Sequence, residues 1–177
     1  MRIVAGSRKG HRIAAPKGLA TRPTGDRVRE AAFNLVGAVD GATVLDLFAG
    51  SGAMGLEALS RGARRCVFVE SDGAAARAIQ AHLEKLRLTG AVMLRRDALD
   101  VLREEATAGR LYDLVVADPP YDAWAELEPR LAQTLPAVLA PDGLAVVETA
   151  AKVEPQLPLD LVTSRRYGSA RITIFRP

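Results

Sequence analysis

Val44-Leu45-Asp46-Leu47-Phe48-Ala49-Gly50-Ser51-Gly52-Ala53-Met54-Gly55 is an apolar run that ends in three glycines at G-x-G-x-x-G spacing. A segment that favours a helix follows at once. A strand, a glycine turn and a helix start, in that order, place backbone N–H groups at the carboxyl end of a strand, where a ligand can approach the main chain. The stretch therefore predicts an α/β sheet with a binding site at this turn.

Apolar runs and helical patterns alternate after this stretch. We expect strands at residues 43–48, 66–70, 91–95, 112–118 and 143–148, and helices at residues 53–61, 73–88, 98–108 and 123–139. This alternation predicts a Rossmann-like, mostly parallel sheet with helices on both faces. Residues 159–167 and 170–175 flank Gly168-Ser169, which predicts an antiparallel hairpin at one edge of the sheet.

Positive charge gathers at the amino terminus. Residues 1–30 carry a net charge of +6, whereas the other 147 residues carry −3. Residues 2–5 and 11–15 predict a basic hairpin, residues 16–25 an extended connector, and Asp26 the N-cap of a helix of about ten residues. Such asymmetry favours a polyanionic partner. A solvated leader, which only keeps the protein soluble, would have the same distribution of charge.

Composition narrows the class of protein further. The chain lacks a run of about 18 apolar residues, so we expect no membrane span. A single cysteine, Cys66, excludes an internal disulfide, and His11 and His82 lack the spacing of metal ligands. We expect a cytoplasmic monomer without a metal ion, in which Cys66 is a buried structural thiol.

Acidic residues stand at or just beyond the ends of four predicted strands. They are Asp46, Glu70, Asp97 and Asp118. Ligands of an open parallel sheet bind beyond the carboxyl ends of its strands, so four carboxylates there predict a ligand rich in hydrogen-bond donors. Glu70 follows Gly50 by 20 residues, where an acid can accept from ribose hydroxyls. This geometry suits NAD and S-adenosylmethionine equally.

Asp118-Pro119-Pro120-Tyr121 favours the second of these ligands. Two prolines fix the backbone and remove two N–H donors, which leaves carbonyl acceptors beside the Asp118 carboxylate. A cluster of acceptors suits a substrate that donates through an NH₂ group, such as the exocyclic amine of a nucleobase. Tyr121 could stack on that base.

These motifs resemble class I S-adenosylmethionine-dependent methyltransferases and, more narrowly, the RsmD family of bacterial 16S rRNA guanine-N2 methyltransferases. The resemblance covers nearly the whole chain, including the start at Arg2-Ile3-Val4-Ala5-Gly6 and the segment from Arg22 to Asn34. One departure is His82, which stands where such proteins often have asparagine.

The resemblance implies a role for each matched residue. The cofactor would be held by Asp46, Ala49, Gly50, Gly52, Glu70, Ser71, Asp97 and Ala98, and the guanine by Asp118, Pro119 and Tyr121. Residues 1–25 would form an RNA-binding extension of a methyltransferase domain at residues 26–177. Cations expected to contact 16S rRNA, within the small ribosomal subunit, are Arg8, Lys9, Arg12, Arg22, Arg27 and Arg29.

Three alternatives remain at this point. An NAD-dependent oxidoreductase would share the glycine turn but has no use for Asp118-Pro119-Pro120-Tyr121. An amine methyltransferase acting on DNA or on another RNA would share that tetrapeptide. A ribosome-assembly factor that has lost catalysis would keep only the binding surfaces.

Overall fold

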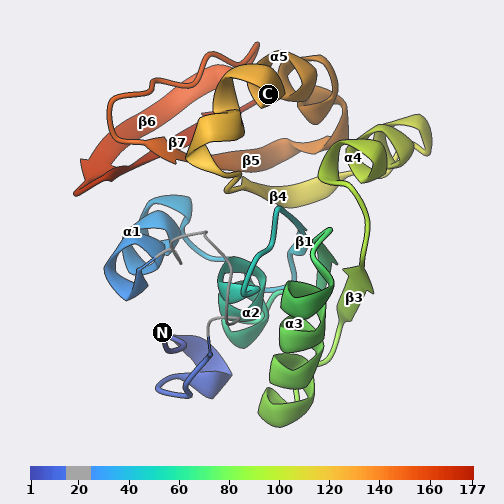
Figure 1. Cartoon of the computed structure of the whole chain (residues 1–177), viewed down its shortest axis with the longest axis vertical. Coiled ribbons are helices and arrows are strands. Elements are labelled where there is room, and N and C mark those ends of the chain that lie inside the picture. Colours follow the sequence, from blue (N-terminus) through green and yellow to red (C-terminus); the bar gives the residue numbers. More distant parts are fainter. Residues whose placement is uncertain (15–24) are drawn as a thin grey trace.

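The computed structural model describes residues 1–14 and 25–177 of the 177-residue chain. Its centre is a seven-stranded sheet with the order β3-β2-β1-β4-β5-β7-β6 (Figure 1). The strands are β1 (Thr43–Leu47), β2 (Arg65–Val69), β3 (Ala91–Leu94), β4 (Tyr112–Ala117), β5 (Leu139–Ala150), β6 (Asp160–Tyr167) and β7 (Ala170–Arg176). The helices are α1 (Asp26–Val36), α2 (Ala53–Ser60), α3 (Gly73–Leu86), α4 (Ala98–Thr107) and α5 (Trp124–Thr134), with short 3-10 turns η1 (Gly6–Arg8), η2 (Tyr121–Ala123) and η3 (Leu135–Val138).

The strand directions confirm the predicted Rossmann-like architecture. Strands β1 to β5 pair in parallel, whereas β7 is antiparallel to both of its neighbours, β5 and β6. Two antiparallel steps leave β6 running in the same direction as β5. The turn between β6 and β7 therefore lies at the edge of the sheet where the parallel strands end, which is the ligand-binding edge of such sheets.

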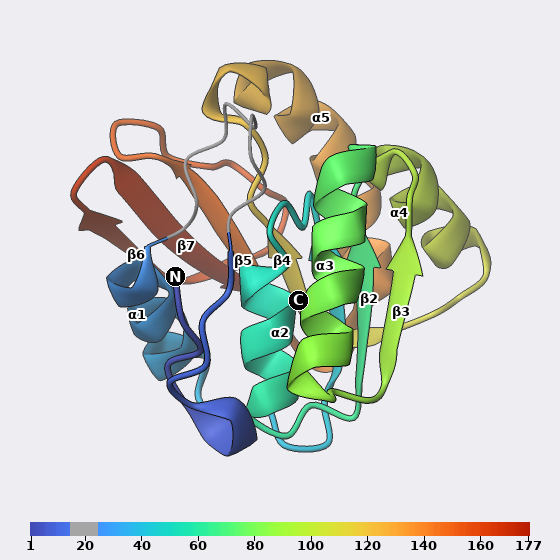
Figure 2. The same cartoon turned by 60° about the horizontal axis from the view of Figure 1, so that its bottom comes forward.

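The core consists of one apolar layer on each face of the sheet. Successive strand side chains point to opposite faces, so Val44 joins the layer with α1, α2 and α3, while its neighbour Leu45 joins the layer with α4 and α5. Figures 1 and 2 show these two groups of helices on opposite sides of the sheet. Among the described residues no helix is both long and apolar enough to cross a bilayer.

The segment after η2 differs from its predicted form. A helix was expected over residues 123–139, but α5 ends at Thr134 and a 3-10 turn containing Pro136 follows. Pro136 lacks the N–H that would bond to the carbonyl of Ala132, which favours the end of the helix here, whereas Pro129 is accommodated inside α5. Strand β5 then starts at Leu139, four residues before its predicted start, and its pairing with β4 is irregular between Tyr112 and Leu114.

The amino-terminal segment forms a minimal hairpin rather than two strands. A single bridge joins Arg2 to Arg12, and the tip is the turn η1. Ile3 and Ile13 are buried in the same apolar layer as α1 and α2. The described part of residues 1–25 is thus packed on the rest of the protein. The division into an RNA-binding extension (residues 1–25) and a methyltransferase domain (residues 26–177) stays a prediction.

The buried carboxylate of Glu57, on α2, holds this segment in place. It accepts hydrogen bonds from the backbone N–H groups of Val4 (2.8 Å) and Ala5 (2.9 Å). Its oxygens also lie 2.8 Å from Arg61 Nε and 3.4 Å from Arg29 Nε. A buried carboxylate is costly unless donors surround it, so these contacts fix the segment, α1 and α2 relative to one another.

Asp26 begins α1 instead of capping it. The N-cap is Gly25, and Asp26 Oδ1 accepts from Arg29 Nη2 at 2.9 Å and from the Arg2 N–H at 3.2 Å. The predicted N-cap role of Asp26 is therefore wrong. Its carboxylate joins α1 to the amino-terminal segment.

Two glycines of the hairpin allow a test of this docking. Gly6 and Gly10 both have positive φ (79° and 85°), but a Cβ on Gly6 would lie 1.8 Å from the Ser60 carbonyl oxygen, whereas a Cβ on Gly10 would meet no described heavy atom within 4 Å. Gly10→Ala should cost only the strain of the left-handed conformation, about 1–2 kcal/mol. Gly6→Ala should lower the Tm further, because α2 or the hairpin must move. Equal Tm shifts in thermal unfolding would show that the hairpin is not docked.

Candidate active site

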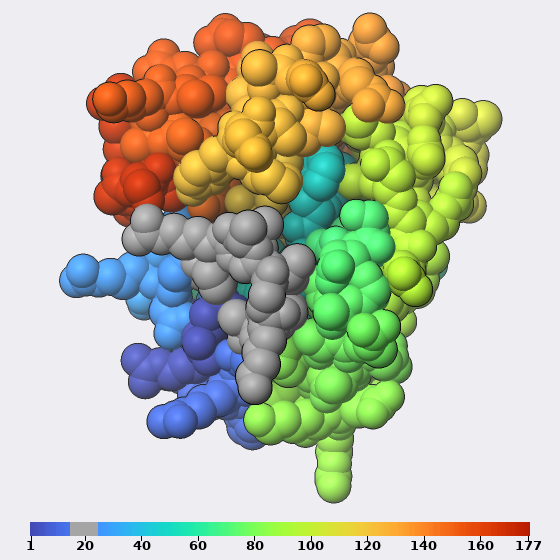
Figure 3. Space-filling model, viewed as in Figure 1, coloured from blue at the N-terminus to red at the C-terminus, as the bar shows by residue number. Residues whose placement is uncertain are grey.

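A cavity of about 800 Å³ opens at the carboxyl edge of the sheet. In Figure 3, teal atoms of the segment after β1 lie in a recess between the gold atoms that follow β4 and the green atoms of α3. The residues predicted for the cofactor and for the amine line this one cavity, namely Asp46, Ala49, Gly50, Glu70, Ser71, Asp97, Ala98, Asp118, Pro119 and Tyr121. The structure thus brings the two predicted sites together.

The exception is Gly52, which is buried beneath the glycine turn at the start of α2. Its φ is 77°, and a Cβ there would lie 2.9 Å from Ile79 Cγ1 on α3. Glycine is needed at this position for the turn and for the close approach of α3. Gly52 therefore has a packing role, and its contact with the cofactor stays a prediction.

Asp46 supports the glycine turn from below. It is 2% exposed, and its Oδ2 accepts from the Gly55 N–H at 2.9 Å. Burial raises the pKa of Asp46 to about 7; the bond from Gly55 opposes this shift and the charge of Glu70 adds to it. The cavity thus contains a carboxyl group that a nearby positive charge would ionise.

Glu70 clamps two segments of backbone. Its Oε2 accepts from the Gly50 N–H at 2.7 Å, and its Oε1 accepts from the Asp72 N–H at 2.8 Å. These bonds hold the glycine turn beside the start of α3. Asp97 caps α4 in a similar way, because its Oδ1 accepts from the N–H groups of Leu99 (2.9 Å) and Asp100 (3.1 Å).

The segment after β4, the neighbour of β1, also lines the cavity. Asp118 and the two prolines lead into η2, and Tyr121 at its start donates its hydroxyl proton to Glu148 Oε1 at 2.8 Å. Glu148 lies on β5 and is 7% exposed. Ser169, in the turn between β6 and β7, also lines the cavity.

Several lining residues were missed by sequence reasoning. They are Phe48, Ser51, Ala53, Met54, Val69, Arg96, Pro120, Asp122 and Ser169. Most are neighbours of predicted residues and could have been found by extending each motif. Ser169 could not, because it reaches the cavity through the direction of β6 and β7, which no local pattern encodes.

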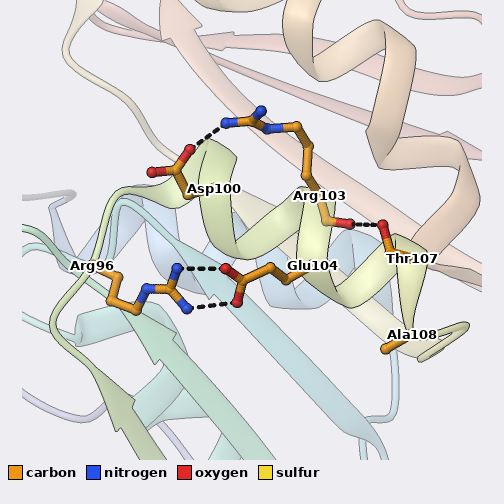
Figure 4. Close-up of a pocket in the computed structure, with 6 residues that line it drawn as sticks. All are labelled: Arg96, Asp100, Arg103, Glu104, Thr107 and Ala108. Carbon is orange, nitrogen blue, oxygen red and sulfur yellow. Dashed lines mark hydrogen bonds and ion pairs between the residues drawn. The ribbon is translucent and has the colours of Figure 1, made fainter.

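A smaller hollow of about 450 Å³ lies on the outer side of α4. Figure 4 shows its polar side chains joined to one another: Arg96 donates to both carboxylate oxygens of Glu104 (2.6 and 2.5 Å), and Arg103 pairs with Asp100. These charges compensate each other, so the hollow presents no net charge that would attract a charged ligand. The same pairing holds Arg96, at the rim of the main cavity, toward α4.

The cations predicted to contact RNA fall into different classes. Arg29 is fully buried beside Glu57, so its predicted RNA contact is wrong. The Arg8 guanidinium donates to the carbonyls of Leu86 and Arg87 at the end of α3, so it holds the segment to that helix, and its contact with RNA stays a prediction. Exposed side chains are those of Lys9, Arg12 and Arg27, while Arg22 lies outside the described residues.

Two further side chains with possible chemistry are buried. Burial raises the pKa of the Cys66 thiol, as expected of a structural thiol. His82 Nε2 accepts from the Ala14 N–H at 3.1 Å, and burial lowers the pKa of its imidazole. Within residues 1–14 and 25–177, no group of three or more His, Cys, Asp or Glu is placed to hold a metal ion.

Comparison with known proteins gives a consistent set of relatives. The model of the family described as Conserved hypothetical protein 95 matches residues 1–176. A putative rRNA methyltransferase of Bacillus subtilis, YlbH, is 39% identical, over 99% of this chain and 98% of the relative. Ribosomal RNA small subunit methyltransferase D of Escherichia coli is 38% identical over 68% of this chain, and the match spans 60% of that relative's length.

Solved structures share the fold, one of them over nearly the full length of both chains. A putative methyltransferase from Escherichia coli, yhhF, is 32% identical with a TM-score of 0.83, covering 99% of this chain and 96% of that one. A putative methyltransferase complexed with SAH is 19% identical with a TM-score of 0.66, covering 82% of this chain and 48% of that one. At such low identity the second likeness shows the fold alone.

The raised pKa of Asp46 predicts how stability changes with pH. The folded protein keeps the Asp46 proton up to about pH 7, whereas an unfolded chain releases it near pH 4. Between these values the folded state binds more protons, so this group lowers the free energy of unfolding as pH rises, by at most about 1.4 kcal/mol per pH unit.

Asp46→Asn removes this titration but keeps an oxygen acceptor for Gly55. Relative to the variant, the wild type should lose stability between pH 4.5 and pH 7, as measured by urea unfolding at several pH values. Parallel pH profiles of the two proteins would contradict the raised pKa.

Proposed function

This chain belongs to the family described as Conserved hypothetical protein 95, the RsmD family, and from that premise we propose that it methylates the exocyclic N2 amine of a guanine in 16S rRNA. The names of the relatives support the coarser activity, that of an rRNA methyltransferase. Because methyl transfer needs a methyl donor, this activity favours S-adenosylmethionine over NAD, a choice that the glycine turn and Glu70 leave open. Guanine N2 as the acceptor atom is our proposal.

The observation that supports it best is the shared cavity. The glycine turn and Glu70 line it from β1 and β2, and Asp118, Pro119 and Tyr121 line it from the neighbouring strand β4, so donor and acceptor molecules can meet in one space. Holding two reactants in this way is the main source of rate enhancement when neither needs an acid or base. A volume of about 800 Å³ is within the range of small-molecule sites.

The cavity residues suit the cofactor. S-adenosylmethionine supplies a methyl group on a positively charged sulfur, and it also carries amine and hydroxyl donors. Acceptors in the cavity match these groups: Asp46 would face the amino-acid end, Glu70 the ribose and Asp97 the adenine amine. Asp46, with a pKa of about 7, would be ionised by the cofactor's positive charges.

The amine end suits a nucleobase. The Asp118 carboxylate and the Pro119 carbonyl would each accept a hydrogen bond from one N–H of the N2 amine, which turns the nitrogen lone pair toward the methyl group. Stacking on Tyr121 would add about 1–3 kcal/mol to binding. The nitrogen loses its proton after alkylation, so the step requires orientation and polarisation rather than a strong base.

The docked amino-terminal segment would contact the RNA backbone. Its exposed cations, Lys9 and Arg12, and Arg27 on α1 are available for phosphates. Because Glu57 and Arg8 tie the segment to the body, these cations have a fixed position relative to the cavity. The rRNA of the small ribosomal subunit is the substrate that we propose for this surface.

Asp118→Ala should abolish the acceptor cluster and leave the cofactor end intact. We expect methyl transfer to small subunits to fall by about 10² to 10³, with the Kd for S-adenosylmethionine changed less than about twofold because the acceptors proposed for the cofactor, on Asp46, Glu70 and Asp97, are kept. Tritiated methyl transfer and nucleoside mass analysis measure both the rate and the product. Asp113→Ala, at the start of the same strand, is the matched control.

The expected product of the wild type is N2-methylguanosine in 16S rRNA. A different methylated nucleoside would refute guanine N2 as the acceptor. Full turnover by Asp118→Ala would show that the amine is held elsewhere.

The combined variant Lys9→Gln, Arg12→Gln, Arg27→Gln tests the RNA surface. If each cation contacts one phosphate, the slope of log K against log salt should fall by roughly one for each residue. The control is Arg64→Gln with Arg65→Gln, at the start of β2 and away from the carboxyl edge. An unchanged slope in the triple variant would favour a segment that serves only solubility.

A further inference from the structure

We propose that Glu148 is a positioning residue of the amine site, which fixes the ring of Tyr121 at the cavity through its hydroxyl. The inference rests on the proposed function, because Tyr121 is taken to stack on the target base. Glu148 was not singled out by any motif, since it lies in an ordinary apolar strand.

Strand register places Glu148 beside Asp118. Strands β4 and β5 pair in parallel with Val116 opposite Val146 and Ala117 opposite Val147. The next residues along the two strands are Asp118 and Glu148. Val116 and Val146 belong to the same apolar layer, and side chains two residues apart share a face, so both acids start from the same side of the sheet.

Glu148 is itself a rigid anchor. It lies inside β5, with β4 on one side and β7 on the other, where it pairs with Ile172. Its side chain is 7% exposed and accepts the Tyr121 hydroxyl at 2.8 Å. A hydrogen bond to a buried carboxylate is stronger than one between neutral groups, and it is protected from competing water.

Tyr121 benefits from such an anchor because it lies on a short, partly exposed turn. All three residues of η2 are at least partly exposed, and Tyr121 itself is 37% exposed. An aromatic ring on a short exposed turn would have to be ordered when the base binds, which costs affinity. The bond to Glu148 orders the ring beforehand. Glu148 therefore acts on the RNA substrate through Tyr121, while the cofactor end of the cavity is unaffected.

A double-mutant cycle tests this coupling. Tyr121→Phe keeps the ring but removes its hydroxyl, and Glu148→Ala removes the acceptor. Each should raise the KM for small subunits by about tenfold, as the loss of one charge-assisted hydrogen bond implies. The Kd for S-adenosylmethionine should change less than about twofold. The double variant should be no worse than either single variant, because both remove the same bond.

Two more variants separate positioning from structure. Glu148→Gln keeps an oxygen that accepts the hydroxyl proton, so it should restore most of the KM. Asp142→Ala, which removes an exposed acid near the start of β5, is the control for a general change in charge. If Glu148→Ala fails to fold, Glu148→Gln, which keeps the hydrogen bond, can still be compared with Tyr121→Phe, which removes it.

Additive effects of Tyr121→Phe and Glu148→Ala would overturn the proposal, as would an equal loss of cofactor binding. The identity of the methylated nucleoside tests the proposed function separately. If the wild type methylates a base other than guanine, that function fails, whereas coupling between Tyr121 and Glu148 is still read from the KM for the true substrate.

Discussion

The hydrogen bond from the Gly55 N–H to Asp46 joins the two elements on which the structure depends. It fixes the first turn of α2 against the end of β1, and it shapes the glycine turn between them. The bond requires α2 to lie very close to the sheet. A Cβ on Gly55 would come within 2.3 Å of the Phe68 ring and 2.6 Å of Cys66 Sγ, so only glycine permits this approach. Fold and cofactor site therefore share one constraint.

The same helix carries the second organising charge. Glu57 is two residues further along α2 and gathers the amino-terminal segment and α1 around its buried carboxylate. Arg29 compensates this charge from α1, and Arg61 does so from the end of α2. The arginines near the amino terminus thus divide between internal ion pairs and the surface. The net charge of the segment counts both the buried, paired arginines and the exposed ones. Only the exposed ones belong to the surface that RNA would meet.

The parts of the fold and site that sequence predicts are those encoded locally. The glycine turn, the alternation of strands and helices, and the acids at strand ends all lie in short patterns, and the structure places them as expected. Glu148 and Ser169 reach the amine site through the pairing of β5, β6 and β7, which depends on contacts between distant residues. Arg29 was predicted at the surface, yet it shares helical spacing with buried Ala32 and Phe33, and that pattern would have placed it inside.

The clamp made by Glu70 has a consequence for repeated use of the site. Both oxygens of this carboxylate are bonded to main-chain N–H groups of the protein, so the glycine turn takes its shape from the protein itself. Each catalytic cycle leaves a spent cofactor that differs from the fresh one by a methyl group and a positive charge. Because the turn is not held together by its ligand, one cofactor can leave and the next can enter without the loop folding anew.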